Sequence, residues 1–121
     1  MESGTHFWQA FDMLVLSSEI VIDRPRGTAH PRYPDFIYPL DYGYLQGTTS
    51  GDGSGIDVWI GSQSARRVTA LLVTVDGQKR DAEIKLLLDC IPEECQALLA
   101  LHDQSSWGGR QSALLIQRDA L

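Results

Sequence analysis

The chain has 121 residues, a formal net charge of −6 and an apolar content of 43%. This length predicts a single domain, residues 1–121, that buries about two-thirds of its unfolded surface. The acidic balance argues against a nucleic-acid binder, because such proteins gain affinity from clustered Lys and Arg. It is compatible with a small anion held through metal ions, since bound cations invert the local sign of charge.

Neither a membrane segment nor a disulfide framework is indicated. No apolar run approaches the ~20 residues of a membrane span, and Met13–Leu16 is too short for the core of a signal peptide. Cys90 and Cys95 are too few for a disulfide scaffold and, without a nearby His, they make a poor zinc site. We therefore expect two buried or half-buried thiols in a cytoplasmic protein.

The first third of the chain predicts a helix, a strand and an irregular segment. Residues 5–16 predict a short helix capped by Thr5, with a strand as the competitor for its second half. Its apolar positions fall at helical spacing: Phe7, Phe11, Leu14 and Val15. Residues 19–23 predict a strand, and residues 27–38, with two prolines and no periodicity, predict an irregular crossing segment.

The rest of the chain predicts short strands and one late helix. Strands at 42–46 and 56–61 bracket a glycine-rich loop, and the stronger strands at 67–76 and 82–89 flank a turn at 77–80. Pro92 suits the first turn of a helix that runs to about His102, and residues 112–117 predict a last strand. Five or so short strands with a late helix favour a mainly β (α+β) fold, a small closed or partly open barrel.

The most informative stretch is residues 38–57. Asp52 and Asp57 have Gly53 and Gly55 between them, so the loop can fold back until both carboxylates face one point. That arrangement suits a hard cation such as Mg²⁺, which prefers oxygen ligands. Taken alone this spacing is a weak signal, because an Asp in a loop is more often a turn former or a solvated charge.

Several motifs follow one another between Ile20 and Asp89. They are Asp23-Arg24-Pro25, Arg32-Tyr33, Tyr38-Pro-Leu-Asp-Tyr-Gly-Tyr44, the pair Asp52 and Asp57, and the pair Asp76 and Asp81. Their order and spacing resemble those of the soluble inorganic pyrophosphatases. The resemblance implies an OB-like, five-stranded closed barrel with the predicted N-terminal and C-terminal helices. It also implies Mg²⁺-dependent hydrolysis of inorganic diphosphate and assembly into a homo-oligomer.

The resemblance further implies a set of carboxylate metal ligands: Asp23, Asp52, Asp57, Asp76 and Asp81. In it, Asp52, Asp57 and Asp81 share a tightly bound Mg²⁺, and Asp76 and Asp81 hold a second ion. Asp23 orients waters on an outer metal. As a lone acid at a strand end, Asp23 is equally well explained as a solvated charge.

Three side chains are implied as phosphate-side ligands: Arg32, Tyr38 and Tyr42. Arginine suits this role, since its planar fork offers paired donors to phosphate oxygens. The resemblance also assigns catalysis to Tyr42 together with Asp52 and Asp57. The alternative for both tyrosines is packing in the barrel with the hydroxyl at the surface.

The departures from the family pattern bear on catalysis. Ser54 stands where the family has an Asp that helps to take the proton from the attacking water, and losing a general base costs ~10²–10⁴ in rate. In the family pattern a Lys follows the last Asp by two positions, and in this chain that position is Glu83. The hairpin that precedes Tyr-Pro in the family, with its phosphate-binding Arg, is missing. The cations that could compensate are Lys79, Arg80, Lys85 and Arg110.

Two other functions stay open. A catalytically degenerate pyrophosphatase-like module could bind a metal, a phosphate compound or a protein partner without turnover. An OB-like barrel could bind single-stranded nucleic acid by stacking bases on Trp59 and its tyrosines, but the acidic balance disfavours this reading.

The N-terminal segment bears on assembly. Its apolar and aromatic residues have little chain to bury them: Phe7, Trp8, Phe11, Met13 and Leu14. Large exposed apolar patches usually mark contact sites. We therefore expect a homo-oligomer whose interface includes this helix and Trp107, with folding of the helix over its own barrel as the alternative.

Overall fold

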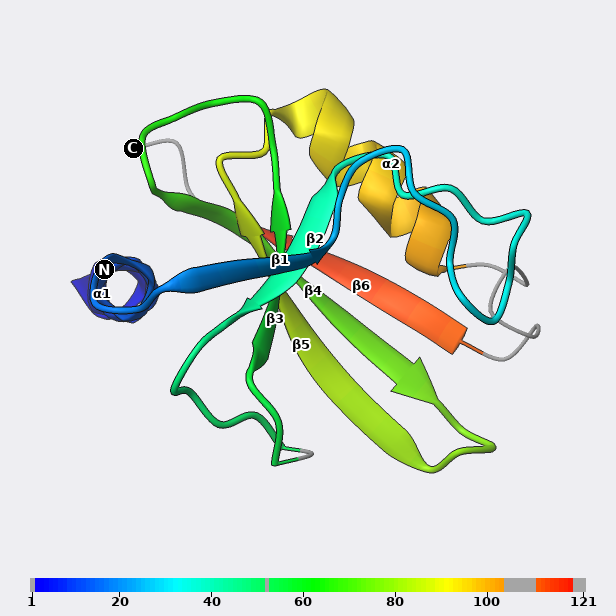
Figure 1. Ribbon diagram of the computed structural model, residues 1–121. Helices are drawn as coiled ribbons and strands as arrows, with labels where there is room; N and C mark the ends of the chain where they lie inside the picture. The colour runs from blue at the N-terminus through cyan, green and yellow to red at the C-terminus, as the bar shows by residue number, and fades with distance from the viewer. Residues whose placement is uncertain (1, 52, 104–110, 119–121) are drawn as a thin grey trace.

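The computed structural model describes residues 2–51, 53–103 and 111–118, with side chains from His6 onward. Within these ranges the chain forms two helices and six strands (Figure 1). In chain order they are α1 (Glu2–Leu16), β1 (Ile20–Arg24), β2 (Asp41–Leu45), β3 (Ile56–Ile60), β4 (Val68–Asp76), β5 (Asp81–Leu88), α2 (Pro92–His102) and β6 (Gln111–Gln117). We found no helix among the described residues that is long and apolar enough to cross a membrane.

The elements lie where the periodicity predicted them, to within a few residues. The helix predicted from Pro92 runs to His102, and the four-residue turn 77–80 joins β4 to β5. Helix α1 begins at Glu2 rather than after Thr5, so Thr5 lies inside the helix and is not its cap. The competing strand in the second half of this segment is therefore excluded.

The strands form one sheet in the order β1-β2-β3-β5-β4-β6. Neighbours are antiparallel except β3 and β5, which run parallel. Among the described strands, β1 pairs only with β2 and β6 only with β4, so these two are the edges. A closed barrel requires its edge strands to pair. The predicted closed, five-stranded barrel is therefore not confirmed, and the sheet is open with six strands.

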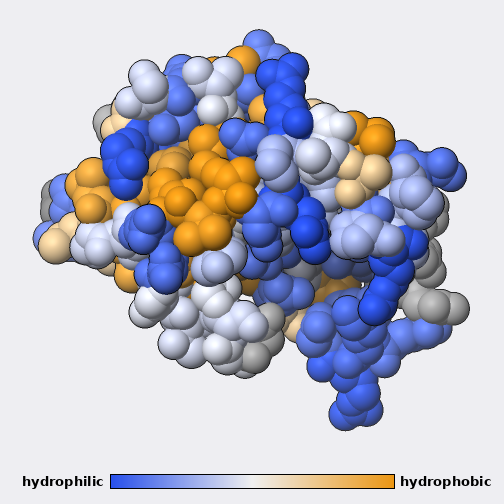
Figure 2. All heavy atoms as spheres, in the orientation of Figure 1, coloured by the Kyte–Doolittle hydropathy of each residue, from blue (hydrophilic) through white to orange (hydrophobic). Residues whose placement is uncertain are grey.

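One side of the sheet, which we term the α1 face, is covered by helix α1. Trp8 and Val15 of the helix pack into an apolar cluster with side chains from four strands: Leu45, Val58, Val68, Leu71, Leu86 and Leu88. Figure 2 shows hydrophobic side chains gathered beside α1 and over β1, whereas the tip of the β4–β5 hairpin is hydrophilic. Burial of these aliphatic side chains, at ~25 cal/mol per Å², makes the α1 face a main source of stability.

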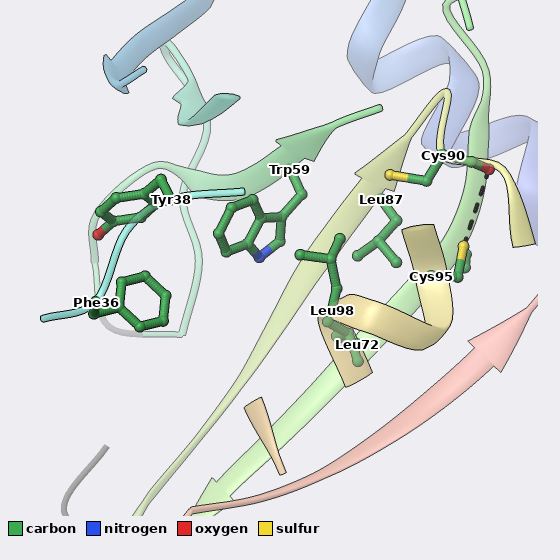
Figure 3. Packing of buried hydrophobic residues seen from close by; sticks show 9 residues of the cluster. Phe36, Tyr38, Trp59, Leu72, Leu87, Cys90, Cys95 and Leu98 are labelled. Carbon is green, nitrogen blue, oxygen red and sulfur yellow. Dashed lines mark hydrogen bonds between the residues drawn. The ribbon is translucent and has the colours of Figure 1, made fainter. Parts of the chain in front are cut away.

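The opposite side, the α2 face, has a different composition. Helix α2 contributes Cys95 and Leu98 to a cluster that combines three aromatic rings with aliphatic and thiol side chains: Phe36, Tyr38, Trp59, Ala70, Leu72, Leu87 and Cys90. Figure 3 shows the Trp59 indole between Tyr38 on one side and Leu87 and Leu98 on the other. Both cysteines are free thiols buried in this cluster, as the sequence predicted.

Two backbone features set the position of Tyr38 and Tyr42. The segment predicted to be irregular folds back on itself, with Tyr38 N–H donating to Thr28 O (2.9 Å) and Gly27 N–H to Tyr38 O (2.8 Å). Next to it, β1 contains a bulge and crosses β2 at Gly43. A side chain at position 43 would overlap the backbone carbonyl of Val21, so only glycine lets the two strands approach this closely.

Candidate functional site

Polar side chains continue the α2 face beyond its apolar cluster. The strand register pairs Asp57 with Lys85 and Trp59 with Leu87 across β3 and β5, and it pairs Tyr42 with Trp59 across β2 and β3. Paired residues point to the same side of a sheet. The sheet therefore brings a carboxylate, an ammonium and a phenol together above the buried indole.

Tyr42, Asp57 and Lys85 form a hydrogen-bonded triad. The Tyr42 hydroxyl donates to Asp57 Oδ2 (2.7 Å), and Lys85 Nζ donates to both the Tyr42 oxygen (2.7 Å) and Asp57 Oδ2 (3.1 Å). Lys85 Nζ also lies 3.8 Å from Glu83 Oε1. Only 10% of the Lys85 side chain is exposed, against 30% for Asp57. A lysine buried to this degree needs paired acceptors, and the triad supplies them.

The Tyr42 phenol stays protonated in this setting. Burial raises the pKa of Tyr42 well above its ordinary value, and the neighbouring charge of Asp57 and the hydrogen bond to it raise the pKa further. The Tyr42 hydroxyl therefore donates its hydrogen bond to Asp57, and its oxygen accepts a hydrogen bond from Lys85. The phenol acts as a spacer that holds the ammonium and the carboxylate at fixed positions.

Behind the triad lies a buried imidazole. The Trp59 indole N–H donates to His102 Nε2 (3.0 Å), and the Gln111 amide donates to the His102 carbonyl (3.0 Å). Burial, followed by the positive charge of Lys85, lowers the pKa of His102 to about 3. His102 is therefore neutral at ordinary pH, and it links β3, α2 and β6 beneath the site.

Two adjoining cavities open from this region. The first, which we term the inner cavity, measures about 310 Å³ and its lining includes Tyr38, Tyr42, Trp59, Glu83, Lys85 and His102. The second, the outer cavity, measures about 580 Å³ and its lining includes Arg32, Tyr33 and Asp76. The two share four lining residues: Arg24, His30, Lys79 and Gln111. They are therefore neighbouring compartments of one hollow rather than separate pockets.

The structure brings some of the predicted site residues together. Tyr42 and Asp57 are hydrogen-bonded, and Asp23 and Tyr38 line the inner cavity beside Tyr42. Arg32 lies in the outer cavity, with its backbone N–H on His30 Nδ1 (3.0 Å). Asp52 lies outside the described residues, as do Trp107 and Arg110.

The predicted Asp76–Asp81 pair lies at the far end of the same face. The two residues face each other across the β4–β5 turn, and Asp76 Oδ1 accepts the backbone N–H groups of Gln78 and Lys79 (3.0 Å each). Because β-strands rise about 3.3 Å per residue, the four residues from Lys85 back to Asp81 span about 13 Å. The structure thus separates Asp81 from Asp57, although the resemblance implied a shared ion.

The carboxylates of Asp57 and Glu83 both lie near Lys85 Nζ, at 3.1 and 3.8 Å. Both line one end of a third, largely apolar cavity of about 480 Å³, next to Ser50 and Gly51 of the glycine-rich loop. Their side chains are 30% and 35% exposed. Among the described residues, which do not include Asp52, no group of three or more His, Cys, Asp or Glu could hold a metal ion. Asp57 and Glu83 nonetheless fit Mg²⁺ chemically, as part-exposed carboxylates on one wall.

The sequence alone did not place Lys85 and Glu83 at the candidate site. It indicated Lys85 only as a possible compensating cation and Glu83 only as a departure from the family pattern. A signal for them existed, because the family pattern places Lys two positions after the last acid, and Glu83-x-Lys85 has that spacing two residues beyond Asp81. His102 and Gln111 carried no such signal. Their places at the site depend on how α2 and β6 pack.

Comparison with known proteins supports the fold. No known family model matches the chain, and no curated protein matches it in sequence. Solved inorganic pyrophosphatases do match. That of Neisseria gonorrhoeae superposes with a TM-score of 0.61 at 16% sequence identity, covering 82% of this chain and 81% of that one. That of Helicobacter pylori gives 0.60 at 13%, covering 82% and 83%. That of Thermus thermophilus gives 0.54 at 20%, covering 82% and 81%.

At such low identity the likeness shows the fold alone. The protein has a pyrophosphatase-like fold, mainly β with two helices. What it does must be argued from its own residues.

Proposed function

We propose that this protein is a Mg²⁺-dependent hydrolase of inorganic diphosphate, with its active site at the Tyr42–Asp57–Lys85 triad. The observation that carries the proposal is the triad itself, whose Tyr42 and Lys85 line the inner cavity together with Arg24 and Lys79. Hydrolysis of a diphosphate consists largely of positioning the phosphoryl groups and neutralising their charge. The triad combines an ammonium that can bind a phosphoryl oxygen with carboxylates that can hold a divalent cation.

Each residue has a proposed role. Asp57, Glu83 and Asp52 would hold Mg²⁺, which supplies charge neutralisation and activation of water in such sites. Lys85 donates to a phosphoryl oxygen, and Tyr42 keeps Lys85 and Asp57 in register. Tyr38 and Arg24 line the wall on which the second phosphoryl group rests. Glu83 thus takes the place that the resemblance gave to Asp81.

The remaining acids keep outer roles in this proposal. Asp23, which lines the inner cavity beside Arg24, orients water around the substrate. Asp76 and Asp81 form the predicted second Mg²⁺ pair at the hairpin, away from the triad. Arg32 lies in the outer cavity, beyond the two phosphoryl groups of a bound diphosphate, so its implied phosphate-binding role concerns longer substrates.

The test is release of phosphate from diphosphate, with Mg²⁺ and with a chelator. We expect Mg²⁺-dependent turnover that Asp57→Ala and Glu83→Gln each lower by at least ~10²-fold. Glu93→Gln, an exposed acid in the first turn of α2, is the control and should keep the full rate. Equal release by the wild type, Asp57→Ala and a protein-free sample would refute the proposal. An Asp81→Asn variant separates the two arrangements. A smaller loss of turnover than in Asp57→Ala fits an outer role for Asp81, whereas an equal loss would return the shared Mg²⁺ ion to the hairpin.

A second function is favoured by one contact. Lys85 Nζ lies 3.1 Å from Asp57 Oδ2, so a cation already neutralises the carboxylate that Mg²⁺ needs. Together with Ser54 in place of an acid, this favours a degenerate module that binds a phosphate compound without turnover. Ser54→Asp distinguishes the two, because a module that has lost its base should gain rate. Wild-type turnover near ~10 s⁻¹ would exclude this second function.

The N-terminal helix supports a proposal on assembly. Trp8 and Val15 are buried in the α1 face, so part of the helix folds over its own sheet. Met13 is 69% exposed, and Phe7 and Leu16 are also exposed large apolar side chains. We propose that these three side chains meet a second copy of the chain. Light scattering on Met13→Glu/Leu16→Glu checks this, since an unchanged oligomer would contradict it.

A further inference from the structure

The outer cavity has a charge distribution that hydrolysis of diphosphate does not require. Three cationic side chains line it, Arg24, Arg32 and Lys79, against one acid, Asp76. Asp76 is occupied in the turn, where its Oδ1 accepts two backbone N–H groups. A concentration of cations in a chain of net charge −6 is a local exception. Such a compartment attracts a multiply charged anion.

The two arginines converge on one side chain. The pKa of His30 is lowered by burial first and then by the positive charges of Arg24 and Arg32. The imidazole is also fixed, because the Arg32 backbone N–H donates to its Nδ1 (3.0 Å). Its ring lies parallel to that of Tyr38, with 6.1 Å between the ring centroids. His30 is therefore a fixed imidazole near which both arginines lie, and all three residues line the outer cavity.

The outer cavity adjoins the inner cavity, which Tyr42 and Lys85 of the triad line. Arg24, His30, Lys79 and Gln111 line both cavities, so the cations form a continuous row from Lys85 to Arg32. Lys85 at the inner end is balanced by Asp57 and Glu83. At the outer end the cations exceed the acids. The outer cavity can therefore bind negative charge that extends past a bound diphosphate. Cavities of a few hundred Å³ also accommodate ligands well above the size of diphosphate.

We propose that the two adjoining cavities bind linear oligophosphates of three or more phosphoryl groups, with the third group on Arg32 and Lys79 and with Arg24 between the second and third groups. This rests on the proposed function and extends its substrate class from diphosphate to tripolyphosphate and longer chains. In hydrolysis, water forms one P–O bond, one bridging P–O bond breaks, and tripolyphosphate gives diphosphate and phosphate, with the released proton passing to solvent. A further phosphate suits this cationic compartment better than a neutral organic group does.

The test is calorimetric titration of the full chain with tripolyphosphate, diphosphate and ADP, in chelator and in Mg²⁺. We expect tripolyphosphate to bind about 10-fold more tightly than diphosphate, as one added set of charge-assisted hydrogen bonds predicts. Arg32→Gln should remove that advantage and leave diphosphate binding within about 2-fold. Arg26→Gln, from a nearby exposed arginine that lines neither cavity, is the matched control. Lys79→Gln and Arg80→Gln form a second pair within one turn, of which only Lys79 lines the cavities.

The outcomes separate this inference from the proposed function. Equal affinity for the two phosphates, or equal losses for both in Arg32→Gln, would overturn it even if diphosphate is hydrolysed. An Arg32-dependent preference for tripolyphosphate would support it even if no diphosphate is hydrolysed. Binding of ADP as tight as that of tripolyphosphate would show that the outer compartment takes an organic group, and would overturn it too.

Discussion

The two faces of the sheet differ in what their side chains do, although adjacent residues of one strand build both. On the α1 face, Leu86 is fully buried among aliphatic side chains under helix α1. On the α2 face, its neighbour Lys85 holds Asp57 and Tyr42 beside an open cavity. Both residues are buried, but only Lys85 carries a polar group, and it lines the inner cavity. Both faces contain a buried cluster, but only the α2 face adds the polar residues of the proposed active site.

The contrast also explains why the α2 face is rich in aromatic residues. Trp59 and Tyr42 are large apolar side chains with a polar group at one end, so they can line a core and still donate a hydrogen bond at its edge. Their donors go to His102 and Asp57. Aliphatic side chains could fill the same volume, but they would leave those acceptors unpaired.

The largest effect on stability expected from a single substitution comes from the α1 face. Leu86→Ala removes a fully buried side chain and should lower the free energy of unfolding by about 3 kcal/mol. It should leave the affinity of the folded protein for diphosphate within about 2-fold, because Leu86 points away from the cavities. Urea unfolding and calorimetric titration measure the two quantities. A large loss of affinity at unchanged stability would break the comparison.

Lys85→Met makes the opposite test one residue away. We expect a loss of about 10²-fold in kcat/KM, close to 3 kcal/mol, since the group that binds the phosphoryl oxygen is gone. The free energy of unfolding should fall by only about 1–2 kcal/mol, because Asp57 keeps its bond from Tyr42 and part of its exposure. Initial rates and urea unfolding check this. Full activity in this variant would remove Lys85 from the site.

Acid should destabilise the protein through the α2 face. The pKa of His102 is about 3 in the folded chain against an ordinary value of 6.5, so below pH 6.5 the unfolded chain takes up a proton that the folded chain refuses. The stability that the neutral imidazole contributes is fully present above pH 6.5 and is lost as pH falls towards 3, by roughly 5 kcal/mol at about 1.4 kcal/mol per pKa unit. Unfolding curves across this range measure the slope. His102→Gln should flatten it, and an unchanged slope would place the acid sensitivity elsewhere.

The smallest effect is expected at the phenol. Tyr42→Phe keeps the ring against Trp59 but removes the hydroxyl that bridges Asp57 and Lys85. We expect a loss of about 1 kcal/mol in stability and about 5-fold to 20-fold in kcat. The KM for diphosphate should change less than kcat, because the residue positions other groups. A larger rise in KM than fall in kcat would mean that Tyr42 contacts the substrate directly.

Sequence reasoning reached the strands and α2 because their signals are local. The apolar runs of β4 and β5, the turn between them and Pro92 each depend on a few adjacent residues. The edges of the sheet could not be predicted in this way. Whether β1 and β6 pair depends on the twist and length of all six strands together.

The contacts of the candidate site also differ in whether they depend on local sequence or on the pairing of distant strands. The Tyr42–Asp57 contact follows from motifs on neighbouring strands, and the sequence had grouped these two residues. The partnership of Asp57 with Lys85 depends on the register of two parallel strands, and a shift of one residue would turn Lys85 to the other face. For that reason the sequence indicated Lys85 only as one of four cations that could replace the missing phosphate ligands. It indicated Glu83 only as the loss of the family's Lys.

The two buried thiols give the molecule a built-in reporter of local unfolding. Cys90 lies two residues before α2 and Cys95 near its start, both inside the cluster that this helix shares with Trp59. A thiol reagent can reach them only when the helix lifts from the sheet. The rate of their labelling in native buffer therefore measures how often that end of the molecule opens, without any substitution. A ligand in the neighbouring cavities that holds the aromatic cluster closed would be read as slower labelling.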